Sequence, residues 1–73
     1  MNFNIKTDCT AECLNKDQAV AQCVQKARTE ATPKCKHTLV LKGGTCVTIE
    51  GLTKDDKCST WQITCISIWS CNG

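Results

Sequence analysis

Eight cysteines in 73 residues constrain this chain more than any other feature of its sequence. A domain this short buries too little apolar surface to be stable on hydrophobic burial alone, and one Phe and two Trp supply all of its aromatic bulk. Such a cysteine density in a short chain is typical of a disulfide scaffold. Because the number is even, we predict four disulfide bonds and no free thiol, and many pairings are open. The cysteines expected in these bonds are Cys9, Cys13, Cys23, Cys35, Cys46, Cys58, Cys65 and Cys71.

Length and charge narrow the class of protein further. The chain is short enough that we expect one domain over residues 1–73. Disulfide bonds persist in oxidising compartments, which predicts a secreted, extracellular protein. No apolar run approaches membrane-spanning length, so no stable membrane insertion is expected. The net charge of +2 argues against a nucleic-acid partner, which normally needs a strong basic excess. A monomer is the simplest expectation, with the oligomeric state left open.

The first half of the chain predicts a helix from Asn15 to Thr32. Asn15 and Gln18 have the spacing of a capping box, and Pro33 disfavours helical geometry at the residue before it. Apolar residues recur at helical spacing and form one stripe. The stripe consists of Val20, Cys23, Val24, Ala27 and Ala31. Upstream of the helix, we expect a short turn that is capped by Asp8 and contains Cys9 and Cys13.

The second half predicts strands. Gly43 and Gly44 separate two β-type runs, 38–41 and 46–49, and favour a two-residue hairpin because its turn needs positive φ. In that hairpin Leu41 faces Cys46, and His37 pairs with Glu50 across the strands. The polar stretch 51–57 then predicts a loop.

A last strand is predicted from Trp61 to Cys71. One of its faces carries Trp61, Ile63, Cys65, Trp69 and Cys71, and the other carries Ile66 and Ile68. Phe3 and Ile5 add a short edge strand at the N-terminus. The fold class predicted by these elements is α+β, a small disulfide-rich domain with one main helix packed on a three- to four-stranded antiparallel sheet.

Neither a metal site nor an active site is predicted. Structural zinc sites usually supply ligands in close pairs such as Cys-x2-Cys, whereas the closest cysteines here are Cys9 and Cys13. His37 is the only histidine, and no nucleophile stands in a recognisable pattern with it. We therefore expect no metal, no cofactor and no enzyme activity.

Two groups of residues are candidates for binding. Trp61 and Trp69 serve either as core bulk or as exposed interface anchors. The charged segment bounded by Cys46 and Cys58 is the second candidate, because a loop pinned near a disulfide bond is a common place for recognition. It consists of Lys54, Asp55, Asp56 and Lys57.

These features favour a secreted cysteine-rich effector, toxin, or antimicrobial or defence protein that binds an extracellular macromolecule. The alternatives are a serine-protease inhibitor that uses a lysine of 51–57, a pheromone-like signalling protein and a carbohydrate-binding module. The stretch 41–49 resembles the entry to fungal LysM chitin-binding modules, which implies carbohydrate binding. The order of the elements is similar to that of killer-toxin-like effectors secreted by fungi, a resemblance in layout without a shared motif.

Overall fold

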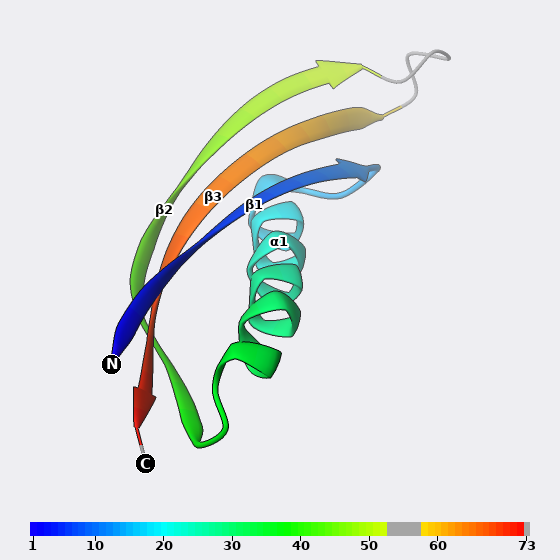
Figure 1. The fold of residues 1–73 in the computed structure, drawn as a ribbon. Helices are drawn as coiled ribbons and strands as arrows, with labels where there is room; N and C mark the ends of the chain where they lie inside the picture. The colour runs from blue at the N-terminus through cyan, green and yellow to red at the C-terminus, as the bar shows by residue number, and fades with distance from the viewer. Residues whose placement is uncertain (53–57, 73) are drawn as a thin grey trace.

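A computed structural model describes residues 1–52 and 58–72. The elements follow the order β1 (Asn2–Glu12), α1 (Lys16–Ala31), the short 3-10 helix η1 (Thr32–Lys34), β2 (Thr38–Leu52) and β3 (Ser59–Asn72). The strands form one antiparallel sheet in the order β1-β3-β2, and α1 lies on its concave face (Figure 1). The predicted fold class is therefore confirmed, with three strands in the sheet.

The helix agrees with its sequence signals. The Asn15 side chain accepts a hydrogen bond from the Gln18 backbone N–H at 2.8 Å, and the Gln18 side chain accepts one from the Asn15 N–H at 3.3 Å. This reciprocal capping box satisfies two donors that the first turn leaves free. The buried face is shifted slightly from the predicted stripe, because Val20 and Val24 are half-buried at its margin. The fully buried positions are Ala19, Cys23, Ala27 and Ala31.

The predicted turn around Asp8 is wrong, because β1 runs through it. Residues 3 to 11 alternate between the helix side and the solvent side of the sheet, and Cys9 faces Ile63 of β3. Cys13 instead occupies the corner between β1 and α1 with a φ of 62°. The chain thus turns one residue after β1 ends, and the edge strand spans 11 residues.

The predicted hairpin at Gly43 and Gly44 is also wrong. Neither glycine has the positive φ that such a turn requires, and β2 continues through both, with a bulge between Leu41 and Gly43. Glu50 faces Trp61 of β3, so it does not pair with His37. Because β2 pairs with β3 along its whole length, a long-range pairing replaces the local one that the sequence pattern favoured. Gly51 and Leu52, which we expected in a loop, end β2.

Gly44 has a packing reason to be glycine. A Cβ atom added to Gly44 would lie 2.7 Å from the backbone oxygen of Ile66, whereas one added to Gly43 would meet no atom within 4 Å. We expect Gly44→Ala to lower the free energy of unfolding by roughly 1–3 kcal/mol, because the strand must shift to relieve the clash. Chemical denaturation measures this loss. Gly43→Ala is the matched control, and an equal loss in both variants would contradict the close approach at Gly44.

Four disulfide bonds link the helix, the strands and the corners. The pairs are Cys9–Cys23, Cys13–Cys58, Cys35–Cys71 and Cys46–Cys65, and no cysteine is free. Cys9–Cys23 ties β1 to α1, and Cys46–Cys65 ties β2 to β3. The prediction of four bonds without a free thiol is confirmed.

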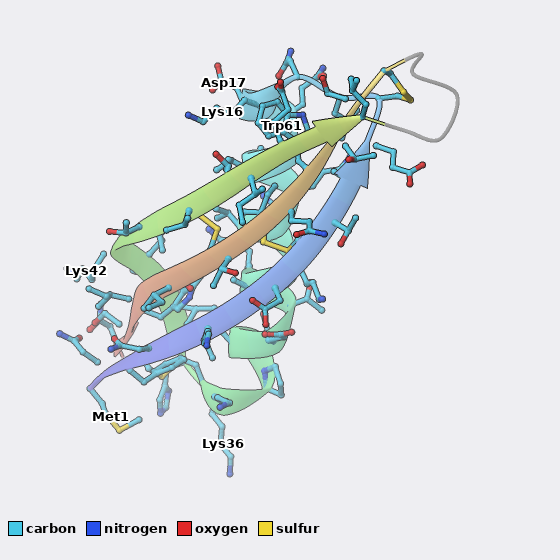
Figure 2. All side chains as sticks on the ribbon, turned by 90° about the horizontal axis from the view of Figure 1, so that it is seen from above. Met1, Lys16, Asp17, Lys36, Lys42 and Trp61 are labelled. Carbon is cyan, nitrogen blue, oxygen red and sulfur yellow. A yellow bond between two sulfur atoms is a disulfide. The ribbon has the colours of Figure 1, made fainter. Side chains whose placement is uncertain are left out.

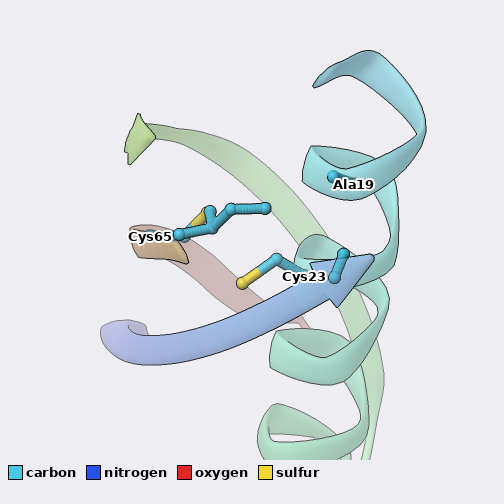
Figure 3. Close-up of a cluster of buried hydrophobic side chains, with 5 residues drawn as sticks. Ala19, Cys23 and Cys65 are labelled. Carbon is cyan, nitrogen blue, oxygen red and sulfur yellow. The ribbon is translucent and has the colours of Figure 1, made fainter. Parts of the chain in front are cut away.

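The core lies between α1 and the two strands beneath it. One cluster joins Ala19 and Cys23 of α1 to Cys65 of β3 (Figure 3). The other surrounds Trp69 with Ile5 of β1 and the last turns of the helix. Because α1 packs mainly on β1 and β3, β2 contributes no fully buried residue to either cluster.

Candidate functional site

Trp69 belongs to the core. It is 0 % exposed, and its Nε1–H donates to Ser67 Oγ at 2.7 Å, while Ser67 Oγ donates to the Ile5 carbonyl oxygen at 3.3 Å. The Arg28 guanidinium carbon lies 5.0 Å from the centre of the Trp69 ring, within the range of a cation–π contact. Trp69 is thus unavailable as an exposed anchor.

Trp61 is half-buried and also engaged. Its Nε1–H donates to the Leu14 carbonyl oxygen at 2.9 Å, and its ring packs beside the core cluster of Ala19 and Cys23. Figure 2 shows it at the same end of the molecule as Lys16 and Asp17, where α1 begins. Trp61 and Trp69 therefore do not form a joint stacking platform. The other predicted binding residues, Lys54, Asp55, Asp56 and Lys57, lie outside the described residues.

The apolar surface of the molecule is concentrated on β2. Of the eight large hydrophobic residues that are exposed in the described part of the chain, five belong to this strand. They are Val40, Leu41, Val47, Ile49 and Leu52. Val47, Ile49 and Leu52 are each more than 60 % exposed, at 63 %, 62 % and 65 %. Exposed apolar residues gathered in one place are typical of interaction sites, so β2 is the best candidate binding element among the described residues.

An apolar groove runs along the inner face of β2, where α1 leaves the strand uncovered. Its volume is about 340 Å³, and the helix contributes one wall through Val20, Val24 and Ala27. The floor and the second wall are the middle of β2 and β3, residues 41, 43–46 and 65–67. A groove of this size lies at the lower end of the range for small-ligand pockets, roughly 300–1,000 Å³. We call it the α1–β2 groove.

The lining of the α1–β2 groove offers few polar groups. Of its two polar residues, Thr45 lies on the outer face of the sheet opposite Ile66, and Ser67 Oγ is already engaged with Trp69 and with the Ile5 carbonyl. No charged residue lines it. The groove therefore suits an apolar side chain or alkyl chain and would leave a charged group of a ligand without a partner.

The two edges of the sheet differ in chemistry on the outer face. On β1, the positions that face away from the helix are all polar: Asn2, Asn4, Lys6, Asp8, Thr10 and Glu12. On β2 and β3 the same face carries a patch of exposed aliphatic side chains. These are Val40, Val47, Ile49, Ile66 and Ile68. Surface chemistry thus favours β2 over β1 as the side that meets a partner.

A second hollow lies on the other flank of α1, against β1. It is lined by polar residues such as Asp8, Thr10, Gln22 and Lys26. The Lys26 ammonium donates to the Asp8 backbone oxygen at 2.9 Å, and the Asp8 carboxylate accepts from Thr64 Oγ1 at 2.9 Å. Each of the two charged groups thus has one neutral hydrogen-bond partner and stays exposed, so this hollow is polar where the α1–β2 groove is apolar.

The described residues show neither a metal-binding cluster nor a helix that could span a membrane. Within residues 1–52 and 58–72, no three His, Cys, Asp or Glu side chains gather in an arrangement that could hold a metal ion. In that same part of the chain, α1 is too short and too polar to cross a membrane.

The sequence reasoning missed the β2 surface because it divided the strand into a hairpin. Successive side chains of a strand point to opposite faces. In one continuous strand Val47 and Ile49 therefore share a face and Leu52 lies on the other, so the sequence did carry a signal for apolar side chains on both faces. Comparison with known proteins adds no further assignment, because no protein family, no curated protein and no solved structure matches this chain.

Proposed function

We propose that this chain is a secreted binding protein, of the effector, toxin or defence type, that holds an apolar segment of an extracellular macromolecule in the α1–β2 groove. The observation that carries this proposal is the groove itself, an apolar channel between α1 and β2 that includes the exposed Leu41 in its lining. The four disulfide bonds support both secretion and a rigid site.

The rigidity of the scaffold favours binding. Val24 and Ala27 stand on a helix that Cys9–Cys23 ties to β1, and Cys46 in the groove floor is bonded to Cys65 of the neighbouring strand. Walls that are fixed before the ligand arrives lose little conformational freedom on binding. A short apolar segment can therefore bind without a large ordering cost.

The alternatives have less support in the described residues. A protease inhibitor would act through a lysine of 51–57, and both lysines of that stretch lie outside the described residues. A carbohydrate-binding module would stack sugars on exposed aromatic rings, but Trp69 is buried and Trp61 is half-buried. A pheromone-like signal would use the same apolar surface against a receptor, and it stays an alternative to the proposed function.

Selection of peptides from a random phage-displayed library on the immobilised protein tests the proposal. We expect the enriched peptides to share a short apolar segment. Val24→Trp fills the groove with a bulky ring, so these peptides should bind it roughly tenfold or more weakly, which corresponds to about 1.4 kcal/mol or more. The affinity of individual peptides can be measured by fluorescence anisotropy.

The matched control is Gln25→Trp, which places the same ring on the exposed side of α1. The selected peptides should bind this variant like the unmodified protein. Peptides that bind both variants equally well would show that the groove is not the site. Inhibition of trypsin by the unmodified protein, or its retention on chitin, would instead favour the inhibitor or the carbohydrate binder.

A further inference from the structure

β2 is an edge strand with few of the features that usually protect an edge, because its one bulge lies at Lys42 and leaves residues 43–52 regular. It pairs with β3 on one side only, and no described strand lies along its other edge. Edge strands commonly avoid pairing through charged side chains, proline or short length. β2 has 15 residues, no proline, and only two charged residues, Lys42 and Glu50. Its free backbone groups are therefore open to another strand.

The backbone geometry shows which residues present these groups. Met1 and Cys71 exchange two backbone hydrogen bonds, so the polar backbone atoms of Cys71 point towards β1. In a strand the backbone N–H and C=O groups of every second residue point to the same side. The N–H and C=O of Cys65, six residues before Cys71, therefore also point towards β1. Cys46 faces Cys65 with Cα atoms 4.0 Å apart, as in a pair without mutual backbone hydrogen bonds. The N–H and C=O of Cys46 thus point to the free edge.

The same direction holds on both sides of Cys46. Gly44 and Thr48 lie two residues away from it and face Ser67 and Ile63, so their N–H and C=O groups also point outward. An antiparallel strand centred on Cys46 can accept and donate these hydrogen bonds in regular order. The hydrogen-bonding pattern therefore fits a second β2 that is related to the first by a two-fold axis at Cys46.

Charge selects this register among the possible ones. With Cys46 opposite Cys46 of a second copy, Lys42 of each chain meets Glu50 of the other, because the two residues stand four positions before and after Cys46. Opposite charges across a strand pair attract, whereas like charges repel. A register centred on Lys42 or on Glu50 would place like charges opposite each other. Figure 2 shows Lys42 at the side of β2 away from β3.

The faces match in the same register. Thr45 meets Val47 of the second copy, and both belong to the outer face of the sheet, away from α1. Gly43 meets Ile49 of the second copy on that face too, leaving room for the larger side chain. The bulge leaves Lys42 without a partner in β3, so its side chain is free to reach the neighbouring chain.

From these observations we propose that two copies of this chain form a dimer in which the two β2 strands pair antiparallel and symmetrically about Cys46. This pairing joins the two three-stranded sheets into a single sheet of six strands. The dimer sets two α1–β2 grooves on the same face of the joined sheet. It does not rest on the proposed function, because pairing of the strands needs no ligand.

Charge reversal tests the register. We expect the full chain to dimerise in sedimentation-velocity experiments at low salt, and Lys42→Glu or Glu50→Lys alone to raise the dissociation constant by roughly tenfold, because each creates two like-charge pairs. The double variant Lys42→Glu with Glu50→Lys restores both pairs and should recover the unmodified affinity. Lys6→Glu on β1 is the matched control and should change nothing.

The backbone pairing has its own test. Thr48→Pro removes an N–H that points to the free edge and so costs the monomer no hydrogen bond within the sheet. This variant should remain folded by circular dichroism and be monomeric. A chain that stays monomeric at millimolar concentration would overturn the proposal. So would a dimer that Thr48→Pro leaves intact, or a double variant as weak as the single ones.

Discussion

Replacing Trp69 by alanine should lower the free energy of unfolding by about 4 kcal/mol, within the range of about 3–5 kcal/mol for buried large aromatic residues. The side chain is 0 % exposed and fills the cluster with Ile5, Ala27 and Ala31. Alanine would leave a cavity between α1 and the sheet, which a helix tied down by Cys9–Cys23 cannot readily close. Urea denaturation with all disulfide bonds intact measures the loss.

Trp69→Phe separates the bulk of the ring from its hydrogen bond. Phenylalanine keeps much of the apolar volume but loses the N–H that donates to Ser67 Oγ. Ser67 retains its bond to the Ile5 carbonyl, so we expect a loss of only about 1–2 kcal/mol, made up of one hydrogen bond and a small void. A loss as large as that of Trp69→Ala would show that the polar contact, and not the packing, dominates at this site.

The helix could be predicted from the sequence because its signals are local. The capping box of Asn15 and Gln18 lies within one turn. The end of α1 at Ala31 agrees with the prediction, although Thr32 keeps helical dihedral angles and the chain continues through Pro33 as η1. Such contacts are between residues that are close in sequence, so they form wherever the segment goes. The strand at Trp61 to Cys71 was predicted for a similar reason, because strand-forming residues recur along the segment itself.

The partner of β2 could not be predicted from local pattern. Two glycines between β-type runs favour a turn when only neighbouring residues are considered, but here β3 and the Cys46–Cys65 bond hold the strand straight through them. The cysteine that decides this pairing is 19 residues away in the chain. Gly44 is required by the carbonyl oxygen of Ile66, and that contact exists only once the strands have met.

The candidate site was missed for the same physical reason. The rare, large side chains of Trp61 and Trp69 were predicted as binding candidates, but Trp69 is buried in the core and Trp61 donates to the Leu14 carbonyl oxygen. The apolar surface comes instead from ordinary aliphatic residues such as Val47 and Ile49. Whether such residues are buried depends on which face of the sheet α1 covers, and Val47 and Ile49 lie on the face away from it.

Removing the Cys35–Cys71 bond should cost about 3 kcal/mol of unfolding free energy in the double variant Cys35→Ala with Cys71→Ala. The bond spans 36 residues, and the loop-entropy relation alone gives about 4 kcal/mol for that length. The Cys46–Cys65 bond shortens the connection, because Cys46 is only 11 positions after Cys35 and Cys71 only six positions after Cys65. Closing a shorter loop removes less conformational entropy from the unfolded chain, so the expected loss of unfolding free energy falls from about 4 to about 3 kcal/mol.

The background without Cys46–Cys65 tests this mechanism. When Cys46 and Cys65 are both alanine, the unfolded chain regains the full loop, and loss of Cys35–Cys71 should then cost nearly 4 kcal/mol. Cys35 and Cys71 are both half-buried, so little core packing is lost with them and the entropy of the unfolded chain dominates. Calorimetry of the four proteins gives the coupling between the two bonds. A smaller cost in that background than in the unmodified chain would show that the bond acts through contacts of the folded state.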